Sequence, residues 1–178
     1  MIKKLTLYGL FVLFGFFMGY KGFIHYYPQL LFLGAKYKIG GKENTLKHAK
    51  LPDDTSRFVV KPNHDFLYST RFYDLTNGPV LIEADVSIDS YWSVALYLPN
   101  TVNFYVQNSD ALNDDKFQLY LYDKEVDACA QPGVTQIKTK APKGLVLFRF
   151  LVTDTTTAAY QKIKQAQQSI RVTKTQCE

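Results

Sequence analysis

The chain has 178 residues and a formal net charge of +5, and its aromatic residues include 13 Tyr and 13 Phe. Residues 1–50 contain eight Lys and one Glu, whereas residues 51–178 carry a small excess of acidic side chains. The basic residues therefore gather near the N-terminus, and no nucleic-acid motif accompanies them, which argues against a protein that binds nucleic acid.

The first element is an apolar segment. Lys3 and Lys4 precede an uncharged run from Leu5 to Tyr20. A helix extended to Ile24 covers a bilayer core of about 30 Å, because each residue adds about 1.5 Å. We therefore predict a transmembrane anchor in residues 1–27. Since basic residues before such a helix stay in the cytoplasm, the C-terminal part is expected to be translocated across the membrane.

A cleaved signal peptide is the alternative interpretation of this segment. Signal peptides share the basic start and the apolar middle, but their cleavage requires small residues in an A-x-A-like pattern. The sequence FFMGYKG at residues 16–22 is bulky where small residues are needed. An uncleaved anchor is therefore preferred.

Gly15 and Gly19 lie four residues apart inside the apolar segment. Small residues at this spacing let another helix approach closely. They predict a helix-packing face toward a membrane partner or a second copy, although glycine is also simply common in membrane helices.

Residues 28–54 are predicted to form a helical, basic linker beside the membrane. Pro28 marks a kink or a restart, Gly40 and Gly41 end the helix, and residues 43–49 are expected to add a turn or two. The lysines of this linker are expected to lie near the phosphates of membrane lipids, where each contributes about 1 kcal/mol; they are Lys36, Lys38, Lys42, Lys47 and Lys50.

Residues 55–178 carry the pattern of a β-domain. Tyr91 to Leu98 alternates, with Trp92, Val94 and Leu96 on one face, as in a half-buried strand. Short strands separated by turn residues predict a mainly β fold, an antiparallel β-sandwich or jelly-roll-like domain. The expected strands are 57–61, 66–73, 80–84, 91–98, 103–107, 117–122, 134–139 and 144–152.

A helix is predicted from Thr155 to about Ser169, with Asp154 as its N-cap. Four apolar residues fall on one face of this helix, which is expected to pack on the sheet; they are Ala159, Ile163, Ala166 and Ile170.

Two cysteines, Cys129 and Cys177, lie in the part predicted to be translocated. An oxidising compartment permits a structural disulfide between them. Separate free thiols are the alternative. The chain has no C-x-x-C pair, and its three histidines are widely spaced, so no metal site and no cofactor is predicted.

The densest group of polar residues runs from Lys61 to Asp74. An aspartate beside a histidine can orient the imidazole and raise its pKa, so His64, Asp65 and Tyr68 are the catalytic candidates. The preferred interpretation is a turn in which Asn63 and Asp65 bond to backbone amides. The binding candidates are Asn63, Asp65, Tyr68, Arg71 and Arg149.

Arg149 is unusual because it shares a predicted strand face with Leu145, Leu147 and Leu151. A buried guanidinium needs a partner, for which Asp65 and Asp74 are the candidates. An arginine that reaches water at the end of the strand is the other interpretation.

Several of these segments resemble the bacterial domain-of-unknown-function family 1254 over residues 55–172. Residues 63–69 (NHDFLYS) are similar to its N-x-D-T-L-Y-S motif, and residues 73–80 are similar to its D-L-S-x-G-P-V motif. Residues 91–94 resemble its R-Y-Y-S-x-Q strand, residues 100–104 its T-N-x-F turn, and Arg149 with Asp154 its R-x-x-V-x-D pattern. Phe66 stands where the family usually has Thr, and His64 is also unusual for the family. These departures argue against an active site shared by the whole family, so the resemblance implies no catalytic residues for this chain.

The resemblance implies a β-sandwich that often accompanies a domain of unknown-function family 1214. That second domain is missing from this chain, so a separate membrane-anchored partner is implied. Because the family is bacterial, the helix is expected in the inner membrane, with the N-terminus in the cytoplasm and the C-terminal domain in the periplasm. The preferred function is accordingly non-enzymatic: an accessory subunit whose periplasmic domain docks onto another membrane protein. The alternative is a membrane-tethered hydrolase or small-ligand-binding domain that uses Asn63, Asp65, Tyr68 and Arg149.

Overall fold

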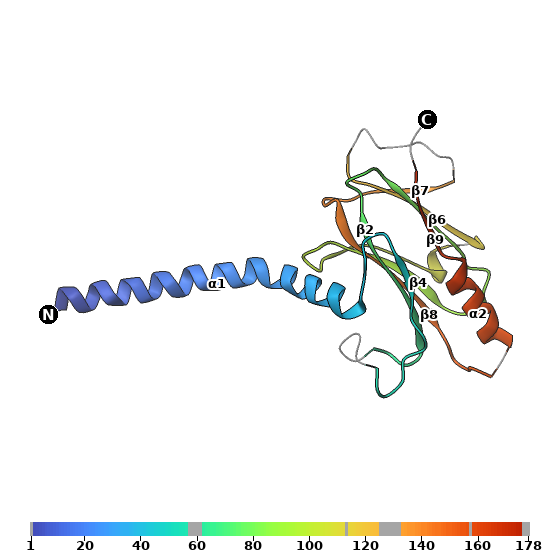
Figure 1. Cartoon of the computed structure of the whole chain (residues 1–178), viewed down its shortest axis with the longest axis horizontal. Helices are drawn as coiled ribbons and strands as arrows, with labels where there is room; N and C mark the ends of the chain where they lie inside the picture. Colours follow the sequence, from blue (N-terminus) through green and yellow to red (C-terminus); the bar gives the residue numbers. More distant parts are fainter. Residues whose placement is uncertain (1, 57–61, 113, 125–132, 157, 176–178) are drawn as a thin grey trace.

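The computed structural model describes residues 2–56, 62–112, 114–124, 133–156 and 158–175. One long helix, α1, leads into a β-domain made of two sheets, with a second helix, α2, on one side (Figure 1). The helix projects away from the domain along most of its length and meets it only through its last turns (Figure 1).

Helix α1 spans Ile2–Ile39 without interruption. It is long and apolar enough to cross a membrane, and it fits an anchor or a signal sequence equally well by that measure. Pro28 lies inside the helix instead of ending it. Because proline removes one backbone hydrogen bond, it accounts for the change of direction of α1 in its last third (Figure 1).

A five-stranded antiparallel sheet has the order β1-β2-β8-β4-β5. Its central pair is β2 with β8, in which Tyr68 lies opposite Arg149. The strands are β1 (Leu46–His48), β2 (Phe66–Asp74), β8 (Lys143–Leu151), β4 (Trp92–Tyr97) and β5 (Asn103–Asn108).

The second sheet has four strands in the order β7-β6-β3-β9. Its pairs are antiparallel except for β6 with β7, which run parallel, so the purely antiparallel expectation is wrong for this pair. The strands are β7 (Thr135–Lys138), β6 (Lys116–Tyr122), β3 (Val80–Asp85) and β9 (Arg171–Lys174), and a short 3-10 helix, η1 (Ser109–Ala111), precedes β6.

The core lies between the two sheets, as the sandwich prediction requires. Alternate residues of β8, β4 and β6 are fully buried there, and their aromatic rings meet edge to face, as in the contact of Phe117 with Phe148. Helix α2 (Ala158–Ser169) covers part of the core with Ile163 and Ala166, and Ile170 follows it. Ala159 is exposed, so the predicted apolar face begins one turn later than expected.

Most predicted strands are confirmed within a residue or two, but two short ones were missed. The segment 43–49, expected to be helical, contains the edge strand β1, and β9 follows α2 without any predicted strand. Asp154 accepts hydrogen bonds from the backbone and hydroxyl of Thr156, which closes a turn four residues before α2 begins. The strand predicted at 57–61 lies outside the described residues.

Candidate functional site

The junction between α1 and the β-domain is held by a defined helix end. The amide of Gly40 donates to the carbonyl of Tyr37, and the amide of Gly41 donates to that of Lys36. Gly40 has a φ of 65°, so the two bonds form a Schellman motif that ends the helix at the predicted glycines. Lys47 from β1 also donates to the carbonyl of Ile39, where a cation complements the helix dipole.

Aromatic packing fixes the direction of the helix at this junction. The ring of Phe32 on α1 meets that of Phe72 on β2 edge to face, with centroids 5.4 Å apart. The ammonium of Lys36 lies over the same Phe72 ring. Gly41 lies so close to Phe72 that a Cβ there would overlap the ring. Only glycine at this position lets the chain leave the helix beside the sheet.

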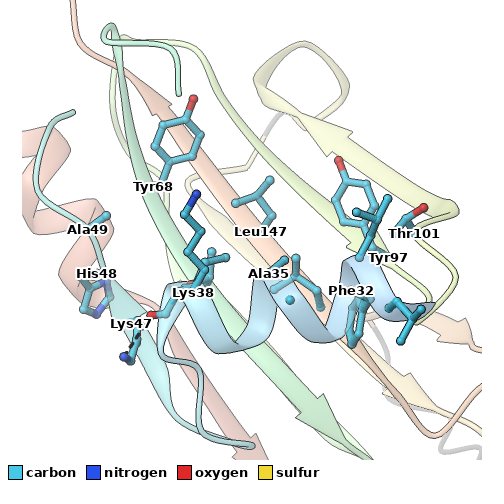
Figure 2. A pocket seen from close by; sticks show the side chains of 16 residues that line it. Phe32, Ala35, Lys38, Lys47, His48, Ala49, Tyr68, Tyr97, Thr101 and Leu147 are labelled. Atoms are coloured by element: carbon cyan, nitrogen blue, oxygen red, sulfur yellow. Dashed lines mark hydrogen bonds between the residues drawn. The ribbon is translucent and has the colours of Figure 1, made fainter. Parts of the chain in front are cut away.

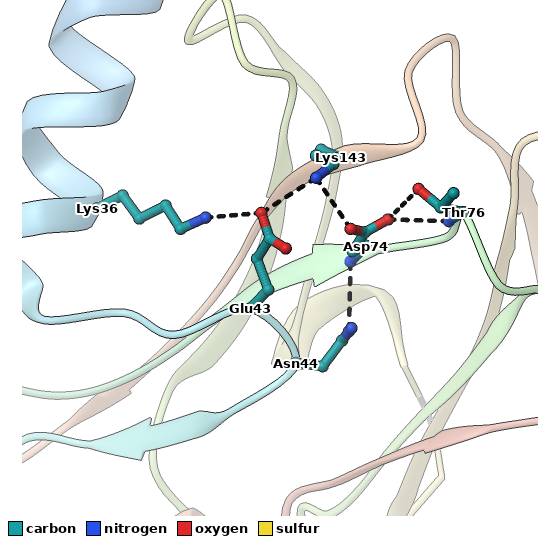
Figure 3. A network of polar contacts seen from close by, with 6 residues as sticks. All are labelled: Lys36, Glu43, Asn44, Asp74, Thr76 and Lys143. Carbon is teal, nitrogen blue, oxygen red and sulfur yellow. Dashed lines mark hydrogen bonds and ion pairs between the residues drawn. The ribbon is translucent and has the colours of Figure 1, made fainter.

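A chain of ion pairs connects α1 to the edge of the sheet (Figure 3). Glu43 accepts from Lys36 at 2.8 Å and from Lys143 at 3.2 Å, and Lys143 also contacts Asp74 at 3.0 Å. Hydrogen bonds from the two lysines lower the pKa of Glu43. Hydrogen bonds from Thr76, together with Lys143, lower the pKa of Asp74. Two carboxylates and two ammoniums thus neutralise each other at this point.

An apolar groove of about 780 Å³ lies between the last turns of α1 and the outer face of the five-stranded sheet (Figure 2). Leu31 and Ala35 form its helix wall, and Leu145 and Leu147 form its sheet wall. The remaining lining residues are Leu30, Phe32, Gly34, Lys38, Ile39, Lys47, His48, Ala49, Tyr68, Thr70, Tyr97 and Thr101.

The two ends of this groove differ in charge. Lys38, Lys47 and His48 gather at the end beside Tyr68, whereas Phe32, Tyr97 and Thr101 mark the other end (Figure 2). No aspartate or glutamate is among the described residues that line it. The groove therefore offers apolar walls with cations at one end.

The predicted site around residues 63–65 forms an exposed turn. The side-chain oxygen of Asn63 accepts from the amide of Asp65 at 2.9 Å, as the turn interpretation predicted for Asn63. His64 lies 3.6 Å from Asp54 and remains largely exposed, and the backbone carbonyl of Asp65 accepts from Val152. Asn63, His64 and Asp65 do not line the groove.

The other predicted residues fall on different faces of the sheet. Tyr68 lines the groove and accepts from the amide of Asn63 at 3.2 Å. Arg149 lies on the outer face of β8, directly across from Tyr68 on β2. In the described part of the chain, it forms an ion pair with neither Asp65 nor Asp74. It donates to the hydroxyl of Ser93 at 3.1 Å and stacks on the ring of Phe66.

Arg71 points the other way and is buried. Its guanidinium donates to the carbonyl of Val172 at 2.8 Å and contacts Asn44 at 3.5 Å, while its Nε has no partner in the described structure. Burial lowers the pKa of Arg71. The contacts tie β2 to β9 and to the segment after α1, which is a structural arrangement.

One pairing was missed by the sequence analysis. Nδ1 of His48 lies 2.9 Å from the hydroxyl of Ser69, although 21 residues separate them in the chain. Burial and the nearby Arg171 lower the pKa of His48. Ser69 is fully buried on the inner face, so its hydroxyl is closed to a substrate. A serine next to a histidine could suggest a nucleophile, but this pair serves packing.

Three further predictions rest on other parts of the chain. Gly15 and Gly19 have no atom near the position of a Cβ, so their helix face is open. Cys129 and Cys177 lie outside the described residues. Among the residues that the structure describes, no group of three His, Cys, Asp or Glu side chains could hold a metal ion.

The fold and the junction define a two-sheet β-domain carried on a long apolar helix. Residues 43–174 match the family model described as "Protein of unknown function (DUF1254)". The chain belongs to the DUF1254 family, as the resemblance implied.

Comparison with one solved structure supports the same fold. The crystal structure of the VPA0106 protein from Vibrio parahaemolyticus is similar with a TM-score of 0.63 at 9% identity, covering 83% of this chain and 34% of that protein. A protein from Burkholderia cenocepacia gives a TM-score of 0.47 at 15% identity, covering 72% of this chain and 34% of that one. This chain thus spans about a third of the length of both proteins. No curated protein matches it.

Proposed function

We propose that the chain is a single-pass protein of a bacterial inner membrane whose periplasmic β-domain serves as an accessory subunit of another membrane protein. Helix α1 both anchors the domain and supplies the docking face. The proposal depends on one observation. The part of α1 that extends beyond the length of a bilayer core carries a row of exposed apolar side chains, which we call the stripe: Tyr26, Leu30, Leu33 and Tyr37.

The length of α1 supports a helix that continues outside the membrane. Its 38 residues extend about 57 Å, whereas a bilayer core is about 30 Å thick. With Lys3 and Lys4 at the cytoplasmic side, the core would end near Ile24. The remaining 15 residues would project about 22 Å into the headgroup layer and the periplasm.

This projecting part carries apolar side chains that nothing in the described structure covers. Leu30 is 63% exposed, Leu33 is 58% exposed and Tyr37 is 90% exposed. With Tyr26, they are spaced by four, three and four residues, which places them on one helix face. Phe32 and Lys36, which contact the domain, lie on another face of the helix. Exposed apolar side chains in such a row favour a docking surface.

The same face continues into the predicted membrane segment. Stepping back from Tyr26 by four, three and four residues reaches Gly22, Gly19 and Gly15, around which the structure leaves open space. Spacings of three and four residues form the seam of paired helices, and small residues allow close contact within lipid. The partner that fits is therefore a membrane-spanning helix. The family resemblance makes a membrane-anchored protein with a family 1214 domain the first candidate.

The proposal is tested by replacing the two stripe residues Leu33 and Tyr37, which do not line the groove. Full burial of a leucine contributes about 1.5–3 kcal/mol, so Leu33→Ala with Tyr37→Ala should cost about 3 kcal/mol of association, roughly a hundredfold. The assay is quantitative co-purification in mild detergent. Val102→Ala with Val106→Ala is the matched control, because both valines are about half exposed on the β-domain.

The wild-type chain should retain one membrane protein at a fixed ratio, and only the stripe variant should lose it. Both variants should unfold like the wild type, because changes at exposed positions shift stability by only about 0.5 kcal/mol. A wild-type chain that purifies alone as a monomer would overturn the proposal. If the wild-type chain instead forms a homodimer through the stripe, the proposal of a different membrane protein as partner is overturned, because the stripe then binds a second copy of this chain.

A membrane-tethered ligand-binding domain is the second candidate, because the groove is apolar and includes Tyr68. Of the four residues expected in such a site, Asn63, Asp65 and Arg149 lie elsewhere. The groove thus favours binding, and no described arrangement favours hydrolysis.

A further inference from the structure

We infer that the groove between α1 and the five-stranded sheet binds a single-chain anionic amphiphile, such as a long-chain carboxylate. Its anionic group lies at Lys38, and its chain extends along Leu31 and Leu147 toward Leu30. This inference goes beyond the docking function. It shares with that proposal the membrane orientation of α1 and one residue, Leu30, which lies at the edge between the two surfaces.

The size and walls of the groove fit an apolar chain. Its volume of about 780 Å³ lies within the range of about 300–1,000 Å³ that small-molecule sites occupy. Leucines from α1 and β8 face each other across it, and its lysines gather at one end (Figure 2). Such a composition is typical of sites that bury an apolar ligand and orient it through a few polar contacts.

The charges at the end of the groove beside Tyr68 specify an anion. Lys36 is neutralised by Glu43, and Lys47 already donates to the carbonyl of Ile39. Lys38, in contrast, extends from α1 toward Tyr68 (Figure 2) and makes no hydrogen bond or ion pair among the described residues. With no carboxylate in the described lining, an anionic ligand would supply the partner that Lys38 lacks.

The orientation of the groove matches an amphiphile that stands in a membrane. The groove follows α1 from Leu30 to Ile39, about 14 Å along the helix axis. The apolar end lies nearer the predicted bilayer, and the cationic end lies farther away. A lipid of the outer leaflet has the same polarity, with its chain toward the core and its anionic group outward. A ligand could therefore enter along α1 without reversing direction.

The experiment uses the full chain in phosphatidylcholine nanodiscs and a photoreactive palmitate analogue with the reactive group near the chain end. Cross-linked peptides are located by mass spectrometry, and palmitate and hexadecanol are the competitors. We expect labelling of residues 30–35 or 145–147. Palmitate should compete about tenfold better than hexadecanol, because a charge-assisted hydrogen bond distinguishes the two.

Variants separate the groove from the surrounding lipid. Lys38→Gln should abolish the preference for palmitate and Lys38→Arg should keep it, while Lys42→Gln is the control because Lys42 does not line the groove. Ala35→Trp should block labelling by filling the groove from the exposed helix, without changing the core of the β-domain.

The inference is overturned if labelling is confined to residues 6–24, if both competitors act equally, or if Ala35→Trp and Lys38→Gln change nothing. Its failure is distinguishable from failure of the docking proposal. Leu33→Ala with Tyr37→Ala should leave labelling intact, and Ala35→Trp should leave co-purification intact, because neither set of residues belongs to the other surface.

Discussion

Gly41→Ala is expected to destabilise the junction between α1 and the β-domain. A Cβ at this position would overlap the ring of Phe72, which is only 2% exposed and packs edge to face against Phe32. The ring cannot move into solvent, so the added methyl group must displace Phe72, α1 or both. Overpacking of this kind costs about 1–3 kcal/mol. For a chain of this size, about 2 kcal/mol corresponds to a fall in Tm of roughly 4–8 °C.

The measurement is thermal unfolding in detergent, followed by near-UV circular dichroism of the aromatic residues. Gly34→Ala is the matched control, since Gly34 lies within α1 and nothing occupies the space around its Cβ position. Replacing that helical glycine should be neutral or should stabilise by up to about 1 kcal/mol. If Gly41→Ala melts at or above the wild-type temperature, the close packing at this junction is refuted.

Three other outcomes follow from the structure. The pKa values of Glu43 and Asp74 are lower in the folded than in the unfolded chain. The two carboxylates therefore stabilise the folded chain above the ordinary carboxyl pKa of about 4, and this contribution is lost as the pH falls toward the lowered values. Lys143→Met should therefore lower the Tm only slightly at pH 7, because Lys143 is exposed to solvent, and should flatten the decline of Tm below pH 5. An unchanged acid profile would contradict the ion-pair chain. Arg149→Met should cost about 1–3 kcal/mol, because it leaves the buried hydroxyl of Ser93 without this hydrogen bond and removes the contact with Phe66. A loss well above about 3 kcal/mol, as expected when a buried ion pair is broken, would contradict that. Alkaline carbonate should leave the chain in the membrane with its N-terminal peptide intact, and a mature chain that begins after residue 22 would show a cleaved signal peptide instead.

The sandwich could be predicted because its central strands alternate. Trp92, Val94 and Leu96 are buried on the core face, as their spacing indicated. Ser93 and Ala95 on the other face are buried as well, beneath the outer surface that Arg149 helps cover. The alternation therefore located the strand, while the burial of its second face depended on neighbouring strands.

The short strands β1 and β9 could not be predicted from local sequence. Each has only three or four residues and is held by its partner: Leu46 lies opposite Arg71, and Val172 lies opposite Ile82. Neither segment has enough residues for a period of two to be recognised. Pairing with an existing sheet, instead of intrinsic propensity, decides the conformation of such segments.

The groove likewise depends on tertiary geometry. The leucines of β8 could be recognised from the sequence as one strand face, but the approach of α1 to them is set by the helix end at Gly40 and by the packing of Phe32 on Phe72. The five juxtamembrane lysines looked equivalent in sequence. In the structure, Lys36 and Lys47 make contacts within the protein, whereas Lys38 remains available at the groove.

The docking face of α1 is the central claim, and site-specific photo-crosslinking in native membranes tests it most directly. A benzophenone side chain placed at Leu33 should form one major adduct, whose cross-linked peptide lies in a membrane-spanning segment of another protein. The same group at Val106, which is 54% exposed on β5, should form no such adduct. Absence of an adduct at Leu33, or the same adduct at both positions, would contradict a docking function for this helix.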